Sequence, residues 1–211
     1  TFFGVFGHFG QSNRKTPKVI RHLAILNMER GKDSTGIALV SKDKTIIYKD
    51  ILPADRFFDY ELQRELNNHR LQPFCLYMGH TRAATHGAVT IENSHPFTEK
   101  DLVFTHNGVI RNFYELQHTY KTRYEVDSQM IGYLLTKKHI DGLDELAGYF
   151  TAPYISRQEP DVLRVAIHSN IFTYAIRGNQ MFYSSTKEHL ERALANKPGF
   201  KFTEITRTDK S

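Results

Sequence analysis

Several features are scarce in this chain, and each scarcity excludes a class of protein. Its 211 residues include one cysteine, Cys75, so an internal disulfide and a four-cysteine zinc site are excluded. No apolar run approaches the roughly 18 residues that a membrane-spanning helix needs, and the mean hydropathy is −0.48. The apolar start TFFGVFGHFG lacks a basic segment and a small-residue cleavage site, so it is not read as a signal peptide. We therefore expect a cytoplasmic protein without a membrane anchor.

The composition can supply a hydrophobic core. Hydrophobic residues make up 40% of the chain and include 15 Phe and 11 Tyr, which argues against extended disorder. The 28 Lys and Arg exceed the 23 Asp and Glu, and the net charge of +5 permits an anionic partner without requiring one. Because no linker, repeat or low-complexity stretch interrupts the chain, we expect residues 1–211 to form a single domain.

Apolar periodicity predicts strands towards both ends of the chain and helices between and after them. Strands are expected at residues 1–9, 36–40, 45–51, 74–80, 102–106, 164–170, 171–178 and 180–185. Helices are expected at residues 16–30, 112–120, 127–139 and 186–197. Thr16 or Asn13 is the expected cap of the first helix, and Ser185 or Thr186 that of the last. The pattern favours an α+β fold with mostly antiparallel sheets.

Four short segments combine polar side chains with glycine beside strand-like runs. They are GKDSTGIA (31–38), GHTRAATHG (79–87), NSHPF (93–97) with THNG (105–108), and EVDSQ (125–129). Arg82 offers a planar fork of donors for a carboxylate, and Asp127 a counter-charge for an ammonium group. The Asn107 amide and the Gly108 backbone N–H can form an oxyanion hole. Together these groups suit an α-amino acid whose side-chain carbonyl is attacked.

Six segments follow one another along the chain as FGVFG, ERGKDSTGIALV, GHTRAATHG, NSHPF, FTHNGVIRN and EVDSQMIGYLL. In this order they resemble the class II glutamine amidotransferases, whose domains are N-terminal-nucleophile hydrolases. The resemblance runs from Phe3 to about Leu194. It implies a four-layer αββα sandwich with mostly antiparallel sheets, and hydrolysis of glutamine to glutamate and ammonia without a cofactor.

The resemblance also implies roles for individual residues. Arg82 would bind the α-carboxylate of glutamine and Asp127 its α-ammonium group. Asn107 and Gly108 would hold the oxyanion of the tetrahedral intermediate. Four further site residues are implied, with Arg30 near the nucleophile and the pocket lined by Thr85, His86 and Gly87.

The nucleophile of the family is missing from this sequence. Family members begin with a cysteine followed by glycine, and the α-amine of that cysteine is the general base. Here the segment FGVFG places Phe3, which has no nucleophilic atom, at the cysteine position. Cys75 lies in a strand-like apolar run and cannot be an N-terminal nucleophile. Loss of glutaminase chemistry is therefore the favoured expectation.

Thr1 offers an alternative nucleophile. On a strand it shares a face with Phe3, and a threonine hydroxyl with its own α-amine as base is a workable nucleophile. To reach the cysteine position, Thr1 would have to shift by two residues along the strand and move Phe3 out of the pocket. The chain is also consistent with an engineered or tagged variant of a cysteine-initiated protein.

Two functions thus stay open at the level of sequence. One is an active glutaminase that supplies ammonia to a separate synthetase or transferase subunit, since 211 residues leave no room for a fused acceptor domain. The other is a catalytically inactive member, a pseudoenzyme that acts as a ligand-binding, regulatory or scaffold module.

Local structural roles compete with some of these assignments. Asp127 is equally suited to cap a helix N-terminus, and Asp33 and Ser34 to fix a turn through local bonds. The histidines lack metal-ligand spacing, so buried, hydrogen-bonded rings and no metal are expected at His80, His86, His95 and His106. Basic stretches occur near both ends, but without a nucleic-acid-binding signature a nucleic-acid partner is not favoured.

Overall fold

The computed structural model describes residues 4–69, 74–84 and 87–207. The helices are α1 (Thr16–Asn27), α2 (Ala54–Phe57), α3 (Tyr60–His69), α4 (Phe113–Tyr120), α5 (Ser128–Lys138) and α6 (Lys187–Leu194), with the 3-10 helices η1 (Met28–Arg30) and η2 (His139–Glu145). The strands are β1 (Gly4–Gly10), β2 (Ser34–Val40), β3 (Thr45–Asp50), β4 (Leu76–Arg82), β5 (Phe97–Glu99), β6 (Leu102–Phe104), β7 (Asn107–Ile110), β8 (Gly148–Ser156), β9 (Glu159–His168), β10 (Asn170–Arg177), β11 (Gln180–Ser184) and β12 (Lys201–Arg207).

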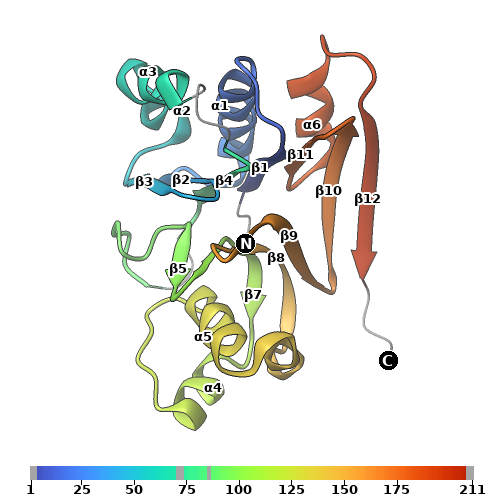
Figure 1. Cartoon of the computed structure of the whole chain (residues 1–211). Coiled ribbons are helices and arrows are strands. Elements are labelled where there is room, and N and C mark those ends of the chain that lie inside the picture. Colours follow the sequence, from blue (N-terminus) through green and yellow to red (C-terminus); the bar gives the residue numbers. More distant parts are fainter. Residues whose placement is uncertain (1–3, 70–73, 85–86, 208–211) are drawn as a thin grey trace.

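The strands form two sheets that face each other (Figure 1). The first sheet has the order β12-β10-β11-β1-β4-β2-β3, and the second has the order β5-β6-β8-β7, with β9 paired to β8. All of the described strand pairings are antiparallel. This confirms the expected antiparallel arrangement.

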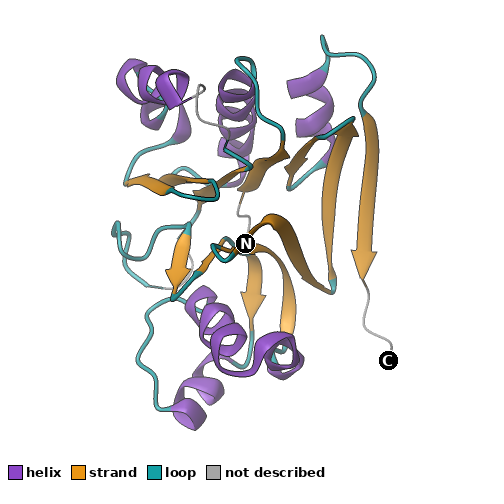
Figure 2. Ribbon diagram, in the orientation of Figure 1, coloured by secondary structure: helices purple, strands orange, loops and turns teal. Residues whose placement is uncertain are grey.

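Helices cover the outer face of each sheet, as Figure 2 shows. Helices α1 and α6 pack on the first sheet around a core that includes Ile20, Leu23 and Leu190. Helix α5 packs on the second sheet through a separate core that includes Met130. A third core that includes Ile155 lies between the two sheets. The order helix, sheet, sheet, helix confirms the four-layer αββα sandwich.

The start of β1 and the end of β4 lie together in the first sheet. Gly4 pairs with Thr81, and Ser34 at the start of β2 pairs with Arg82 on the other side of β4. A side chain at position 4 would collide with Thr81, because an added Cβ would lie 2.3 Å from the Thr81 Oγ1. The register therefore brings the N-terminal part of the chain to the end of β4 that carries Arg82.

The helix caps were only partly predicted. At the start of α1 the cap residue is Lys15, so the caps expected at Thr16 and Asn13 are wrong. The Thr16 hydroxyl instead accepts a hydrogen bond from the Asn13 backbone N–H. At the start of α6 the prediction is confirmed, because the Thr186 hydroxyl accepts from the His189 N–H at 3.3 Å.

Among the described residues, no helix is long and apolar enough to cross a membrane.

Candidate active site

Polar side chains collect between the sheets where β4 ends, β7 begins and α5 begins. Arg82 is the last residue of β4, Asn107 and Gly108 open β7, and Asp127 directly precedes α5. Arg82 is 1% exposed and Asp127 5%. Burial lowers the pKa of the Arg82 guanidinium, while the nearby carboxylates of Asp33 and Asp127 raise it. The fold thus brings an arginine of the first sheet into the electrostatic range of a carboxylate beside the second sheet.

The first-sheet side of the site is built from the end of β4 and the turn before β2. The Asp33 N–H donates to the Arg82 carbonyl at 2.9 Å. The Asp33 Oδ2 accepts a hydrogen bond of 2.8 Å from the Ala84 N–H. Gly31 packs directly on this backbone, since a Cβ there would lie 2.3 Å from the Arg82 carbonyl carbon. The Arg82 guanidinium donates through Nη1 to the Ala88 carbonyl at 3.1 Å. These contacts fix the backbone that presents the guanidinium.

The second-sheet side is built from β7 and the start of α5. The Asp127 Oδ2 accepts a hydrogen bond of 2.9 Å from the Ile110 N–H. The Asn107 carbonyl accepts one of 3.1 Å from the Asn170 side chain. Gly108 has φ +146°, and an added Cβ would lie 2.0 Å from the Tyr149 carbonyl oxygen. This conformation and this close approach require glycine at position 108.

Two local roles expected from sequence are wrong. Asp127 makes no side-chain cap to α5 in the described structure, because its carboxylate is turned towards β7. Asp33 does not close a local turn, because its carboxylate bonds to Ala84, 51 residues away. Ser34 lies within β2, where its hydroxyl accepts from the Ser94 hydroxyl at 2.8 Å. Each side chain is used for a tertiary contact instead.

Three histidines lie buried between Arg82 and the second sheet. The His80 Nε2 donates to the His106 carbonyl at 3.0 Å, and the His80 ring stacks on His95 with centroids 3.9 Å apart. Burial lowers the pKa of His80 to about 3, and also lowers the pKa values of His95 and His106. The expected burial of these three rings is confirmed, and so is the expected hydrogen bonding of the His80 and His106 rings. His86 lies outside the described residues.

The remaining predicted site residues have different outcomes. Gly87 has φ +74°, and its position lies beside the Glu125 carbonyl, so the end of GHTRAATHG meets the segment before Asp127. Arg30 ends η1, which contacts β1 and β4, and burial lowers the pKa of its guanidinium. Thr1 and Phe3, like Thr85, lie outside the described residues. Across the parts of the chain that are described, no group of three or more His, Cys, Asp or Glu is arranged to hold a metal.

Comparison with known sequences identifies the family. Residues 31–139 match the family of class II glutamine amidotransferases. This chain belongs to the class II glutamine amidotransferases. It is 30% identical over 199 residues to glutamine–fructose-6-phosphate aminotransferase [isomerizing] of Chlamydia abortus, an alignment that covers 86% of this chain and 31% of the relative. The Pyrococcus horikoshii protein of the same name is 31% identical over 202 residues, covering 86% of this chain and 32% of that protein.

The class II amidotransferase chain therefore spans about a third of the length of these curated relatives. Among solved structures, glutamine phosphoribosylpyrophosphate amidotransferase from B. subtilis superposes with a TM-score of 0.73 at 18% identity. That superposition covers 96% of this chain and 45% of the other. It shows that the two proteins share the sandwich fold.

The residues that support the site side chains were not recognised from sequence. The Ser128 hydroxyl and the Ile110 N–H lie next to the Asp127 carboxylate, and the Asp33 carboxylate accepts a hydrogen bond from the Ala84 N–H. Ser128 and Asp33 stand within EVDSQ and GKDSTGIA, so membership in these motifs was the available signal. Their partners lie on other elements, and a linear pattern gives no sign of them.

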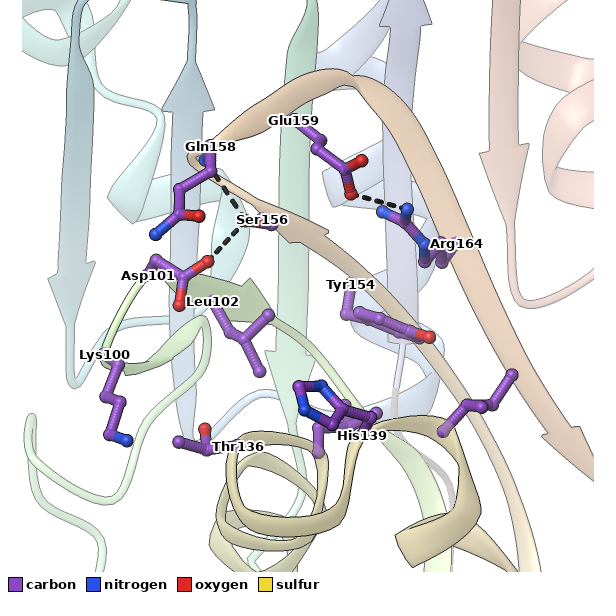
Figure 3. A pocket seen from close by; sticks show the side chains of 12 residues that line it. Lys100, Asp101, Leu102, Thr136, His139, Tyr154, Ser156, Gln158, Glu159 and Arg164 are labelled. Carbon is purple, nitrogen blue, oxygen red and sulfur yellow. Dashed lines mark hydrogen bonds and ion pairs between the residues drawn. The ribbon is translucent and has the colours of Figure 1, made fainter.

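A cavity of about 570 Å³ lies apart from these residues, between the C-terminal end of α5 and the β8–β9 hairpin (Figure 3). Its rim holds an Arg164–Glu159 ion pair at 2.6 Å and a hydrogen bond from Ser156 to Asp101. None of the site residues predicted from the sequence lines it. It lies on the helix-facing side of the second sheet, beside Tyr154 and Leu135.

Proposed function

We propose that this class II amidotransferase domain binds glutamine between its two sheets and does not hydrolyse it. Arg82 binds the α-carboxylate, and Asp127 binds the α-ammonium group. Asn107 and Gly108 receive the side-chain carbonyl oxygen. The observation that supports this most strongly is the placement of a buried guanidinium on the first sheet and a buried carboxylate beside the second sheet, within electrostatic range of each other.

The charges of the site suit a zwitterion. A buried charge is tolerated when an opposite charge or hydrogen bonds compensate it. An α-amino acid adds one negative and one positive group, so it lies between Arg82 and Asp127 without adding net charge to the interior. The three histidines beneath the site have lowered pKa values and add no positive charge at neutral pH.

Hydrolysis is lost in this proposal because Phe3 occupies the nucleophile position of the family. Attack on the amide needs a nucleophilic atom and a base beside it, and a phenylalanine side chain supplies neither. A domain that keeps the ligand groups without the nucleophile acts as a glutamine-binding module.

Calorimetric titration of glutamine tests the binding site. We expect binding by the intact chain and much weaker binding by Arg82→Ala. In Arg82→Lys, a point charge replaces the planar fork, and we expect an intermediate affinity. An affinity that is unchanged in Arg82→Ala would exclude the assigned pocket.

A second candidate function is glutamine hydrolysis with Thr1 as the nucleophile, favoured by the position of Thr1 two residues before Phe3. The released ammonia would then go to a separate synthetase or transferase subunit. The N-terminal residue is first determined by intact mass, and glutamate release is then measured for the unaltered chain and for Thr1→Ala. Release that disappears in Thr1→Ala supports this candidate, and absence of release alongside glutamine binding supports the inactive module.

A further inference from the structure

A chain of buried polar groups runs from His106 to the Asp127 carboxylate. The His106 Nδ1 lies 2.8 Å from the Ser128 hydroxyl and 3.9 Å from the Asp127 Oδ1. The Ser128 hydroxyl lies 3.5 Å from the same Oδ1, while Oδ2 accepts from the Ile110 N–H. The His106 backbone is held in turn by His80 of β4. The carboxylate is therefore approached on one oxygen by a strand N–H and on the other by a serine hydroxyl.

The protonation of this chain follows from what each group can donate. The serine hydroxyl carries one proton, which points either to the His106 Nδ1 or to Asp127. A carboxylate is a stronger acceptor than a neutral imidazole, because hydrogen bonds to charged groups are the stronger ones. Burial lowers the pKa of His106 and keeps the ring neutral, with one N–H to place. An N–H on Nδ1 donates to the Ser128 oxygen and leaves the hydroxyl proton for Asp127.

We propose that Ser128 and His106 are positioning residues that aim the Asp127 carboxylate at the ammonium group of the bound amino acid. The inference rests on the proposed function, since it assigns these residues to the same glutamine site. The separation of 3.5 Å between the Ser128 and Asp127 oxygens is long for a hydrogen bond between oxygens. Hydrogen bonds at active sites are often long without ligand, and the inference requires this one to shorten when the amino acid binds.

The inference makes a prediction about ligand chemistry. In the proposed site, Asp127 contacts only the ammonium group of the ligand. Removal of the Ser128 hydroxyl therefore lowers the affinity only of ligands that carry this group. Glutaramate, which is glutamine without its α-amino group, retains the carboxylate and the amide. A general loosening of the site would instead weaken both ligands alike.

Calorimetry with both ligands tests the inference. We expect Ser128→Ala to weaken glutamine binding about tenfold, the scale of one hydrogen bond to a charged group, and to leave glutaramate within about twofold. Ser128→Thr restores the hydroxyl and the affinity for glutamine. The matched control is Ser94→Ala, another buried serine, which we expect to change neither affinity. In Asp127→Asn, adding Ser128→Ala has no further effect.

The proton on His106 is measured independently of any ligand. Nitrogen-15 NMR of the free protein is expected to show a neutral His106 ring protonated on Nδ1. An unprotonated Nδ1 would overturn the inference, as would equal weakening of both ligands by Ser128→Ala. If the unaltered chain binds glutaramate and glutamine equally, the ammonium contact is absent and the inference fails. If it binds neither ligand, the proposed function fails with it.

Discussion

The two sides of the site are held by different kinds of contact. On the first-sheet side, Arg82 is presented by a backbone that Asp33 and Gly31 clamp from a neighbouring turn. On the second-sheet side, the Asp127 carboxylate itself accepts the hydrogen bond from Ile110. The Arg82 guanidinium is itself buried and donates to the Ala88 carbonyl of the following loop, whereas the Asp127 carboxylate bonds to the backbone of strand β7. The site thus combines a cation supported by loop backbone with an anion supported by strand backbone.

The comparison also shows where the site is vulnerable. Neither side lies within one element, and the packing of one sheet on the other brings the two sides together across the gap between them. The hydrogen bond from His80 of β4 to the His106 carbonyl crosses that gap. Changes on either side are therefore expected to affect stability and ligand affinity in different proportions.

The largest expected effect is on the second-sheet side, at Gly108. In Gly108→Ala the added Cβ would lie 2.0 Å from the Tyr149 carbonyl oxygen and 2.6 Å from the Phe150 Cα, so the backbone of β8 must move. We expect the free energy of unfolding to fall by about 3 kcal/mol or more, measured by urea titration. Gly178→Ala is the matched control, since Gly178 also has positive φ but an added Cβ there would meet nothing within 4 Å. Its expected loss is about 1 kcal/mol, and equal losses would contradict the assigned clash.

His80, which links the two sides, is expected to make the free energy of unfolding depend on pH. The pKa of His80 is about 3 in the folded protein and 6.5 when the side chain is exposed in the unfolded protein. The unfolded state therefore binds more protons at pH values between these two. Stability therefore falls as the pH drops from 6.5 towards 3. His80→Gln keeps an N–H donor for the His106 carbonyl but does not titrate. Between pH 6.5 and 5 we expect the stability of His80→Gln to fall less steeply than that of the unaltered chain, by about 1 kcal/mol per pH unit. Equal slopes in urea titrations would show that His80 is not held neutral.

A smaller effect is expected on the first-sheet side, at Asp33. Asp33→Ala removes the acceptor of the Ala84 N–H and one of the two carboxylates near Arg82. We expect a loss of about 1–2 kcal/mol in the free energy of unfolding. Asp33→Asn retains an acceptor oxygen and should recover most of this stability. The exposed Asp43→Ala is the control and should change stability by less than about 0.5 kcal/mol. A loss in Asp33→Asn as large as in Asp33→Ala would assign the effect to charge rather than to the hydrogen bond.

Sequence patterns predicted elements with a strong apolar rhythm. The helix expected at residues 127–139 is α5, and the strand expected at 45–51 is β3. Strand β12 was missed because it is an edge strand, exposed along most of its length, whose side chains carry little apolar signal. Helix α3 was missed because its sequence is largely polar. Elements that bury little of their surface leave a weak pattern in the sequence.

The main residues of the proposed site were named from the sequence, and the contacts that support them were not. Motif resemblance named Arg82 and Asp127, and the fold brings their charges into range of each other. The roles of Asp33 and Asp127 as local turn and cap residues were wrong, because their partners lie 51 and 17 residues away. Short polar side chains satisfy nearby and distant donors equally well, and only the packing of the sheets decides between them.

The most direct test of a glutamine site shared by two sheets compares glutamine with the amide of γ-aminobutyric acid, which lacks only the α-carboxylate. Both are titrated calorimetrically into the unaltered chain and into Arg82→Ala. A two-sided site predicts that Arg82→Ala weakens glutamine binding to the level of the γ-aminobutyric amide and leaves the affinity for that amide unchanged. An equal loss for both ligands, or no binding of glutamine by the unaltered chain, would contradict it.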